Sequence, residues 1–117
     1  MNVQEVYEAA HGDFEGTLER MMDEEFMAKI LMMFLDDPSF MQLKEAYQAQ
    51  NVSDSFHAAH TLKGVAGNVG LSDLAKKASD VTEALRNSDN IHDADAYMPA
   101  LMQAYETAKQ AIEKLEA

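Results

Sequence analysis

The chain has 117 residues, no cysteine and a formal net charge of −12, with 21 acidic against 9 basic residues. This length fits a single domain with one hydrophobic core, the lack of cysteine excludes disulfides and thiolate metal sites, and the negative charge argues against nucleic-acid binding because phosphates would be repelled. The longest apolar run, residues 30–35, is too short to cross a bilayer, and the acidic N-terminus is unlike a secretory signal, so we expect a cytoplasmic protein without membrane association.

Two short helices are predicted at the N-terminus, before a longer helical segment. Residues 3–10 form the first, and Asp13 can cap a second over residues 14–22, because its carboxylate accepts hydrogen bonds from first-turn amides. The segment 24–50 has apolar residues around most of its circumference, so it must be covered on more than one side. Pro38 should kink or interrupt this segment.

The methionines concentrate between Met21 and Met41. Methionine is unbranched and flexible, and fills irregular gaps in a core well. We therefore expect these side chains mainly to be core filler. An adaptable surface for a partner protein is the alternative.

A helix over residues 53–69 follows, capped by Asn51. Gly70 should end it, because glycine readily adopts the left-handed conformation on which many helices stop. Ser72 should cap the next helix. The buried stripe of that helix would consist of Leu74, Ala78, Val81 and Leu85.

The last helix starts near Asp93 or, because Pro99 resists an interior position, somewhat later. Its buried stripe would consist of Tyr97, Leu101, Ala104, Ala108, Ile112 and Leu115. Helices joined by short turns favour an all-α fold, and we expect one domain built as an antiparallel four-helix bundle. The bundle would comprise residues 23–117, with the short N-terminal helices of residues 1–22 packed over one end.

His60 stands opposite the expected buried face of the helix over residues 53–69. That buried face would consist of Ala58, Leu62, Val65 and Val69. At about 100° per residue, Gly67 lies within about 20° of His60 and Gly64 within about 40°. No side chain then covers the ring one or two turns further on. We therefore expect His60 to be exposed and open to the surface of another protein.

The surroundings of His60 suit a group with two negative charges. Residues 55–72 contain no aspartate or glutamate, and Lys63 brings an ammonium group to the same patch. A neutral imidazole is a good nucleophile at cellular pH, and it can hold a phosphoryl group on nitrogen as a labile phosphoramidate. Lys63 would screen the added charge.

The pattern His60-x-x-Lys63-Gly64, followed by Gly70 and flanked by amphipathic helices, closely resembles the histidine-containing phosphotransfer (HPt) domains of two-component phosphorelays. The stretch "FLDDPSF" and the short N-terminal helices look like the free-standing bacterial members. The resemblance implies a four-helix bundle with the histidine exposed on the second bundle helix. It also implies a phosphocarrier with a phosphohistidine intermediate, and not an ATP-dependent kinase.

Carried over by position, the resemblance implies that His60 accepts and donates the phosphoryl group, Lys63 steadies it, and Gly64 clears space for the partner. The implied partner is a receiver domain, on a response regulator or a hybrid histidine kinase, whose aspartate exchanges the group. The receiver also brings Mg²⁺, so we expect no cofactor on this chain. An unhindered His60 face favours a monomer.

One position departs from the family pattern. Many members carry glutamate or glutamine 22 positions after the histidine, where it bonds the ring, but here that position is Thr82, a weaker orienting group. Glu83 is adjacent but turned by about 100°. Arg86 could offer a second positive charge or be an ordinary solvated arginine. Besides the motif, the expected partner-binding residues are His57, Gly67, Asn68, Thr82 and Arg86.

Two other functions are compatible with this sequence. An adaptor bundle could bind receivers or kinases without carrying phosphate, and Thr82 is the feature that favours it. A metal-binding bundle could use His57 and His60, but two ligands on one helix are insufficient without further ligands, so we expect no metal site. Phe56 could belong to the core or to an apolar rim that docks the receiver.

Overall fold

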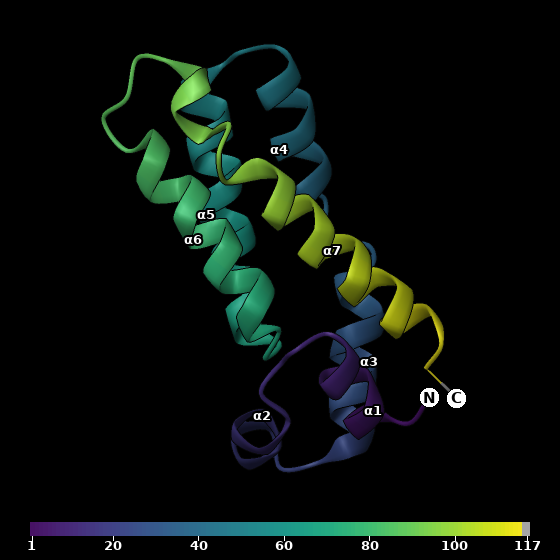
Figure 1. The fold of residues 1–117 in the computed structure, drawn as a ribbon. Coiled ribbons are helices and arrows are strands. Elements are labelled where there is room, and N and C mark those ends of the chain that lie inside the picture. Colours follow the sequence, from purple (N-terminus) through teal and green to yellow (C-terminus); the bar gives the residue numbers. More distant parts are fainter. Residues whose placement is uncertain (116–117) are drawn as a thin grey trace.

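Every element of the computed structural model is helical across residues 1–115, the part of the chain that the structure describes (Figure 1). The α-helices are α1 (Val3–Ala9), α2 (Phe14–Met21), α3 (Glu24–Phe34), α4 (Ser39–Gln48), α5 (Val52–Asn68), α6 (Ser72–Leu85) and α7 (Met98–Glu113), with a short 3₁₀ helix, η1 (Ile91–Ala94), before α7. The prediction of an all-α fold is therefore confirmed. None of the helices within residues 1–115 has both the length and the apolar character that a membrane span requires.

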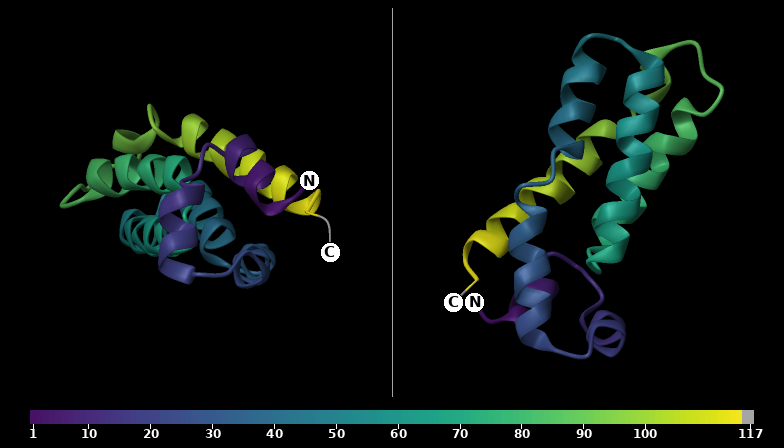
Figure 2. Two further views of the ribbon diagram at one scale, coloured as in Figure 1. Left: turned by 90° about the horizontal axis from the view of Figure 1, so that it is seen from below. Right: turned by 180° about the vertical axis from the view of Figure 1, so that it is seen from behind.

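Helices α4 to α7 pack in chain order, each against the next. The chain reverses direction at each connection, so neighbouring helices run antiparallel (Figures 1 and 2). An ideal four-helix bundle is not confirmed, because the segment expected to form its first long helix is divided in two. Its second half, α4, packs against α5, whereas its first half, α3, packs against α1, α2 and α7.

The division between α3 and α4 falls at Pro38, where the sequence predicts a kink or an interruption. Helix α3 ends at Phe34, and Pro38 occupies the position before α4, where its missing amide hydrogen costs no helical hydrogen bond. The carboxylate of Asp37 accepts a hydrogen bond from the Ser39 amide at 3.0 Å and another from the Ser39 hydroxyl. Pro38 therefore interrupts the segment completely.

Side-chain caps fix the starts of two helices as the sequence predicts. The Asp13 carboxylate accepts a hydrogen bond from the Gly16 amide at 3.0 Å, and the Asn51 side chain accepts one from the Asp54 amide at 2.9 Å. The prediction that Ser72 caps α6 is wrong. Leu71 precedes the helix without a side-chain cap, and the Ser72 hydroxyl instead donates to the carbonyl of His11 at 3.3 Å.

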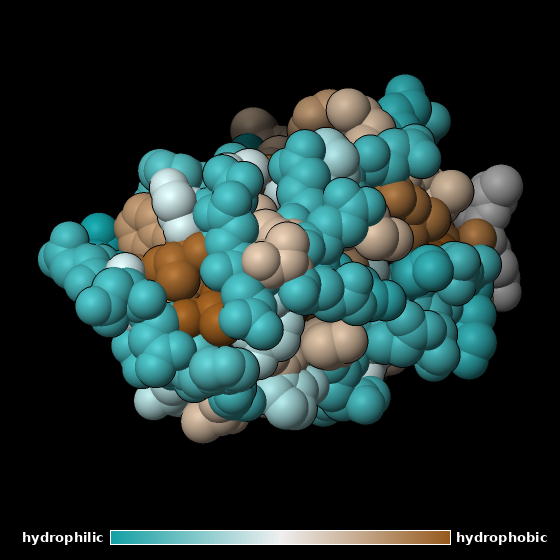
Figure 3. Space-filling view, turned by 90° about the horizontal axis from the view of Figure 1, so that it is seen from above, coloured by the Kyte–Doolittle hydropathy of each residue, from teal (hydrophilic) through white to brown (hydrophobic). Residues whose placement is uncertain are grey.

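The hydrophobic core lies between the apolar stripes of the helices. All four residues predicted for the α6 stripe are buried: Leu74, Ala78, Val81 and Leu85. On α7, Leu101, Ala108 and Ile112 are buried, but Tyr97 is 44% exposed because the helix begins only at Met98. Hydrophobic residues are correspondingly sparse on the face that Figure 3 shows, where they form small separate patches within a mostly hydrophilic surface.

The methionines divide between core and surface. Met27 is fully buried. Four others, Met22, Met32, Met33 and Met41, are between 49% and 85% exposed. The prediction that these methionines are mainly core filler is therefore wrong for these four, which lie on or beside α3 and α4.

Helices α1 and α2 lie at the end of the molecule where α5 turns into α6 (Figure 1). The Tyr7 hydroxyl donates to the carbonyl of Val69 at 2.6 Å, and the Asp13 amide donates to the carbonyl of Gly70 at 2.9 Å. Gly70 has a φ of +81°, a conformation that glycine adopts without strain. A Cβ at Gly12 would lie 2.7 Å from the Gly70 carbonyl oxygen, so this approach depends on glycine.

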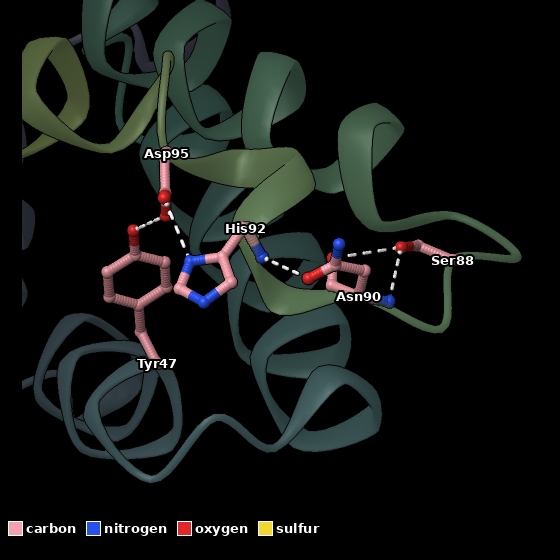
Figure 4. A network of polar contacts seen from close by, with 5 residues as sticks. All are labelled: Tyr47, Ser88, Asn90, His92 and Asp95. Atoms are coloured by element: carbon pink, nitrogen blue, oxygen red, sulfur yellow. Dashed lines mark hydrogen bonds and ion pairs between the residues drawn. The ribbon is translucent and has the colours of Figure 1, made fainter.

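A polar network ties the other end of the molecule together (Figure 4). The Tyr47 hydroxyl on α4 donates to the carboxylate of Asp95, which also contacts the His92 ring at 2.9 Å. The Asn90 side chain accepts from the His92 amide at 3.0 Å, and the Asn90 amide donates to the Ser88 hydroxyl at 3.0 Å. The connection between α6 and α7 is thereby held against α4.

Candidate functional site

Helix α5 turns one face into the core and presents His60 to solvent. Its fully buried apolar residues are Ala59, Leu62 and Ala66, with Ala58 7% exposed. Val65 and Val69, which were predicted to complete the buried stripe, are only half-buried, so the buried face is turned toward Ala59 and Ala66. His60 is exposed, as predicted.

The surface beside His60 is open at both glycines that follow it. A Cβ built on Gly64 or on Gly67 would meet no atom within 4 Å. Neither glycine is therefore required by packing within this chain, although each lowers the helix propensity by about 1 kcal/mol relative to alanine. Their effect is to leave the flank of the His60 ring uncovered.

Phe56 lies one turn before His60, and their rings are stacked. The ring centroids are 6.2 Å apart and the planes differ by 7°, within the range of attractive ring contacts. Phe56 is half-buried, with part of its side chain packed against the core. Phe56 is therefore partly core, as one alternative predicted, and its exposed part contacts the imidazole; a role in docking a receiver stays a prediction.

Helix α6 adds a charged pair beside this stack. The guanidinium carbon of Arg86 lies 5.2 Å from the centroid of the Phe56 ring, within the distance of a cation–π contact. The Nε of Arg86 donates to the Glu83 carboxylate at 2.7 Å. This hydrogen bond is the main reason that the pKa of Glu83 is lowered; desolvation opposes it, and charge interactions with Arg86, Lys63 and His60 lower the pKa further. Glu83, Arg86, Lys63 and His60 thus form one electrostatic cluster.

Comparison with known protein families identifies the family to which this chain belongs. A model of the Hpt domain matches residues 30–117, which is more than half of the chain and contains the whole cluster around His60. The chain belongs to the Hpt domain family. Neither curated proteins nor solved structures gave a significant match. Hpt domains serve histidine phosphotransfer in two-component systems as phosphocarriers rather than kinases, and they interact with receiver domains or kinases.

Thr82 does not join the site of this Hpt domain, which corrects the sequence prediction. It is fully buried, and its hydroxyl donates to the carbonyl of Ala78 at 2.7 Å. A buried hydroxyl that is already bonded within its own helix can neither orient the His60 ring nor contact a partner.

Glu83, the residue after Thr82, is the carboxylate of α6 whose charge interacts with Lys63 and His60. From the sequence, Glu83 is not expected at the site, because it is turned about 100° around the helix from Thr82. The signal that could have identified it is its spacing: Glu83 and Arg86 are three positions apart, so a paired carboxylate was to be expected next to the arginine.

The remaining predicted residues lie at different distances from the cluster. His57 is exposed and meets the Phe56 ring edge-on, with centroids 5.4 Å apart. Lys63 is half-buried on α5. Asn68 is exposed at the far end of α5, where its carbonyl accepts a long hydrogen bond of 3.4 Å from Arg20. Asn68 therefore borders the N-terminal helices of the Hpt domain.

An open groove runs beside the Phe56 ring, between the start of α5 and the end of α6. It is lined by Val52, Ser53, Phe56, His57, Leu85, Arg86, Asn87 and Ser88. This surface is mixed in polarity and continuous with the stack on His60. Across residues 1–115, no three or more histidine, aspartate or glutamate side chains gather in an arrangement able to hold a metal ion.

Proposed function

We propose that His60 is the residue of this Hpt domain that accepts and returns the phosphoryl group. The observation that carries the proposal is the exposure of His60 on α5 with open space over Gly64 and Gly67 on the same flank. In-line attack on an aspartyl phosphate requires the phosphorus to come within about 3.5 Å of a ring nitrogen. A surface without side chains on that flank permits such an approach by a second protein.

The transfer step needs only the ring nitrogen from this chain. A nitrogen of neutral His60 attacks the phosphorus of the aspartyl phosphate, the N–P bond forms and the P–O bond to the aspartyl carboxylate breaks. The carboxylate leaves with the bonding electron pair, and the imidazole ring becomes positively charged until its other nitrogen releases a proton to solvent. The reverse step passes the group to the next receiver aspartate.

We propose Lys63 and Arg86 as the groups that stabilise the phosphoryl group on His60. The lysine is on the same helix, and Arg86 contacts the Phe56 ring on which His60 stacks. The donor would be the receiver domain of a hybrid histidine kinase and the acceptor a response regulator, with Mg²⁺ supplied by the receivers. His57, Gly67 and Asn68 belong to the proposed docking surface, and the carrier would act as a monomer so that this surface stays open.

The test uses a receiver domain phosphorylated with labelled phosphate. We expect the label to move to this protein as an acid-labile, base-stable phosphate. His60→Gln should abolish labelling, whereas His92→Gln, which removes an exposed imidazole outside the proposed docking surface, should retain it. Labelling that survives His60→Gln would contradict the proposal.

An adaptor without phosphotransfer is the second candidate. The observation in its favour is that, within residues 1–115, His60 has no hydrogen bond to set its tautomer, since Thr82 is engaged elsewhere. Binding to a receiver that is equal for the native protein and His60→Gln, with no transfer of label, would favour this function.

A further inference from the structure

The α5 surface around His60 carries no carboxylate, but α6 places one beside it. Residues 55–72 contain neither aspartate nor glutamate. Glu83 reaches the same patch from α6, where it pairs with Arg86 at 2.7 Å. Its pKa is lowered chiefly by that hydrogen bond and also by the charges of Lys63 and His60, so its carboxylate lies within the field of the residues that would surround a phosphoryl group.

Arg86 is committed to two contacts in this structure. Its guanidinium group is bonded to Glu83 and lies over the Phe56 ring, which in turn stacks on His60. The arginine and the imidazole therefore contact the same aromatic ring. Arginine side chains are long, and those of Arg86 and Glu83 are 48% and 58% exposed, so the pair can rearrange without disturbing the core.

We propose that Glu83 holds Arg86 in the resting protein and competes for it with the phosphoryl group on His60, thereby setting how readily that group is passed on. The proposal rests on the function proposed above, in which His60 is the phosphorylated residue. Glu83 would be a positioning residue: it touches neither the phosphorus nor the attacking nitrogen, and acts through Arg86.

Electrostatics gives the direction of the effect. A phosphoryl group brings two negative charges next to Lys63, and the Arg86 guanidinium would have to be shared between that group and Glu83. The Glu83 carboxylate would also repel the doubly charged phosphoryl group on His60. Both consequences raise the free energy of the phosphohistidine relative to the aspartyl phosphate of the receiver. A carrier benefits from this, because a group that is bound too tightly would not move on.

The experiment measures the equilibrium between a phosphorylated receiver and this protein, as the ratio of label on each chain. Glu83→Gln should shift that ratio toward phosphorylated His60 by about two- to fivefold, the size expected for exposed charge pairs. Asp89→Asn is the matched control, because it also removes one negative charge from an exposed position. That control should leave the ratio unchanged.

Arg86→Gln tests whether the effect passes through the arginine. In the Arg86→Gln background, Glu83→Gln should change the ratio much less than in the native background, as a double-mutant cycle would report. In the native protein, the NMR signal of Arg86 Nε should also shift when His60 is phosphorylated. A purely structural role for Glu83 would move neither readout.

The outcomes separate this inference from the proposed function. If His60 accepts label but Glu83→Gln matches Asp89→Asn and the Arg86 signal does not move, Glu83 has no such role while the function stands. If Glu83→Gln instead shifts the ratio toward the receiver, Glu83 supports the phosphohistidine, and the proposal is overturned in sign. If His60 never accepts label, the function itself fails.

Discussion

The imidazole of His60 lies parallel to the ring of Phe56, with centroids 6.2 Å apart and planes within 7° of one another. Phe56 is anchored by its contact with the core, so the stack restricts the rotation of an otherwise exposed histidine. In many Hpt domains a polar side chain on the next helix orients the ring, but here the side chain at that position, Thr82, is buried and bonded to Ala78. An aromatic contact within α5 therefore restrains the His60 ring.

Replacing Phe56 tests the importance of this stack. Phe56→Leu should slow transfer from a phosphorylated receiver by about two- to tenfold, because a ring pair of this kind contributes about 0.5–1.5 kcal/mol. Phe56→Tyr keeps the ring and should transfer at close to the native rate. Rates should be measured in single turnover, and unfolding midpoints should be determined for both variants. Equal rates for the leucine and tyrosine variants would show that the stack does not matter for transfer.

Gly64→Leu separates access to His60 from folding. A side chain at this position meets nothing within 4 Å in this chain, and leucine has a higher helix propensity than glycine. The free energy of unfolding should therefore stay the same or rise by up to about 1 kcal/mol, while transfer from the receiver is blocked. Lys109→Leu, at an exposed position on α7, is the control and should transfer normally. Normal transfer by Gly64→Leu would mean that the receiver does not approach over this glycine.

Gly70→Ala should have the opposite effect on stability from Gly64→Ala. With a φ of +81°, an alanine at position 70 would be strained by about 1–2 kcal/mol. Its Cβ would also lie 2.9 Å from the Thr17 Cβ. Denaturant unfolding should show Gly70→Ala as less stable than the native protein by more than about 1 kcal/mol, and Gly64→Ala as more stable by up to about 1 kcal/mol. Similar effects of the two substitutions would contradict this account of the α5–α6 turn.

Tyr47→Phe should change the titration of Asp95. Hydrogen bonds from Tyr47, and secondarily from His92, hold the pKa of Asp95 below its usual range. Tyr47→Phe removes the larger cause, so the pKa of Asp95 should rise toward the ordinary range, which NMR of the carboxyl carbon can follow. The same hydrogen bond raises the pKa of Tyr47 to about 12.

The sign of the accompanying stability change follows from the lowered pKa of Asp95. A carboxyl group whose folded-state pKa lies below its unfolded value stabilises the fold above the unfolded pKa, and this contribution is lost as the pH falls through the folded pKa. The stability difference between the native protein and Tyr47→Phe should therefore shrink on acidification below pH 4, the region in which carboxyl groups titrate. A stability difference between the two proteins that stays constant from neutral to acid pH would contradict this prediction.

Local signals in the sequence were sufficient for most helix boundaries. Asp13, Asn51 and Gly70 act within their own turns, through a cap or through a left-handed residue, so their effects need no knowledge of distant contacts. The exposure of His60 was predictable for a similar reason, because its angle around the helix relative to the apolar residues of the same helix indicates which way it faces. Pro38 marked the break between α3 and α4 because its backbone chemistry forbids a continuous helix.

Features that depend on contact between helices were not predictable in the same way. The rotation of α5 toward Ala59 and Ala66 is set by the packing of α4 and α6, and it also decides that Val65 and Val69 are only half-buried. The same packing turns Thr82 inward, where it is fully buried. Small residues on one face of α5 gave no strong hydrophobic signal for that rotation.

The end of α5 is held by groups that lie outside the stretch matched by the Hpt family. Carbonyls of Asn68, Val69 and Gly70 accept hydrogen bonds from residues 20, 7 and 13, whereas the match begins at residue 30. A shortened chain starting at residue 30 would leave these carbonyls to water. Since Gly64 and Gly67 make the last turns of α5 poor at holding a helix, unwinding there would spread toward His60, and amide hydrogen exchange would quicken along α5. The first two helices and the loop between them thus stabilise the end of the helix that carries His60.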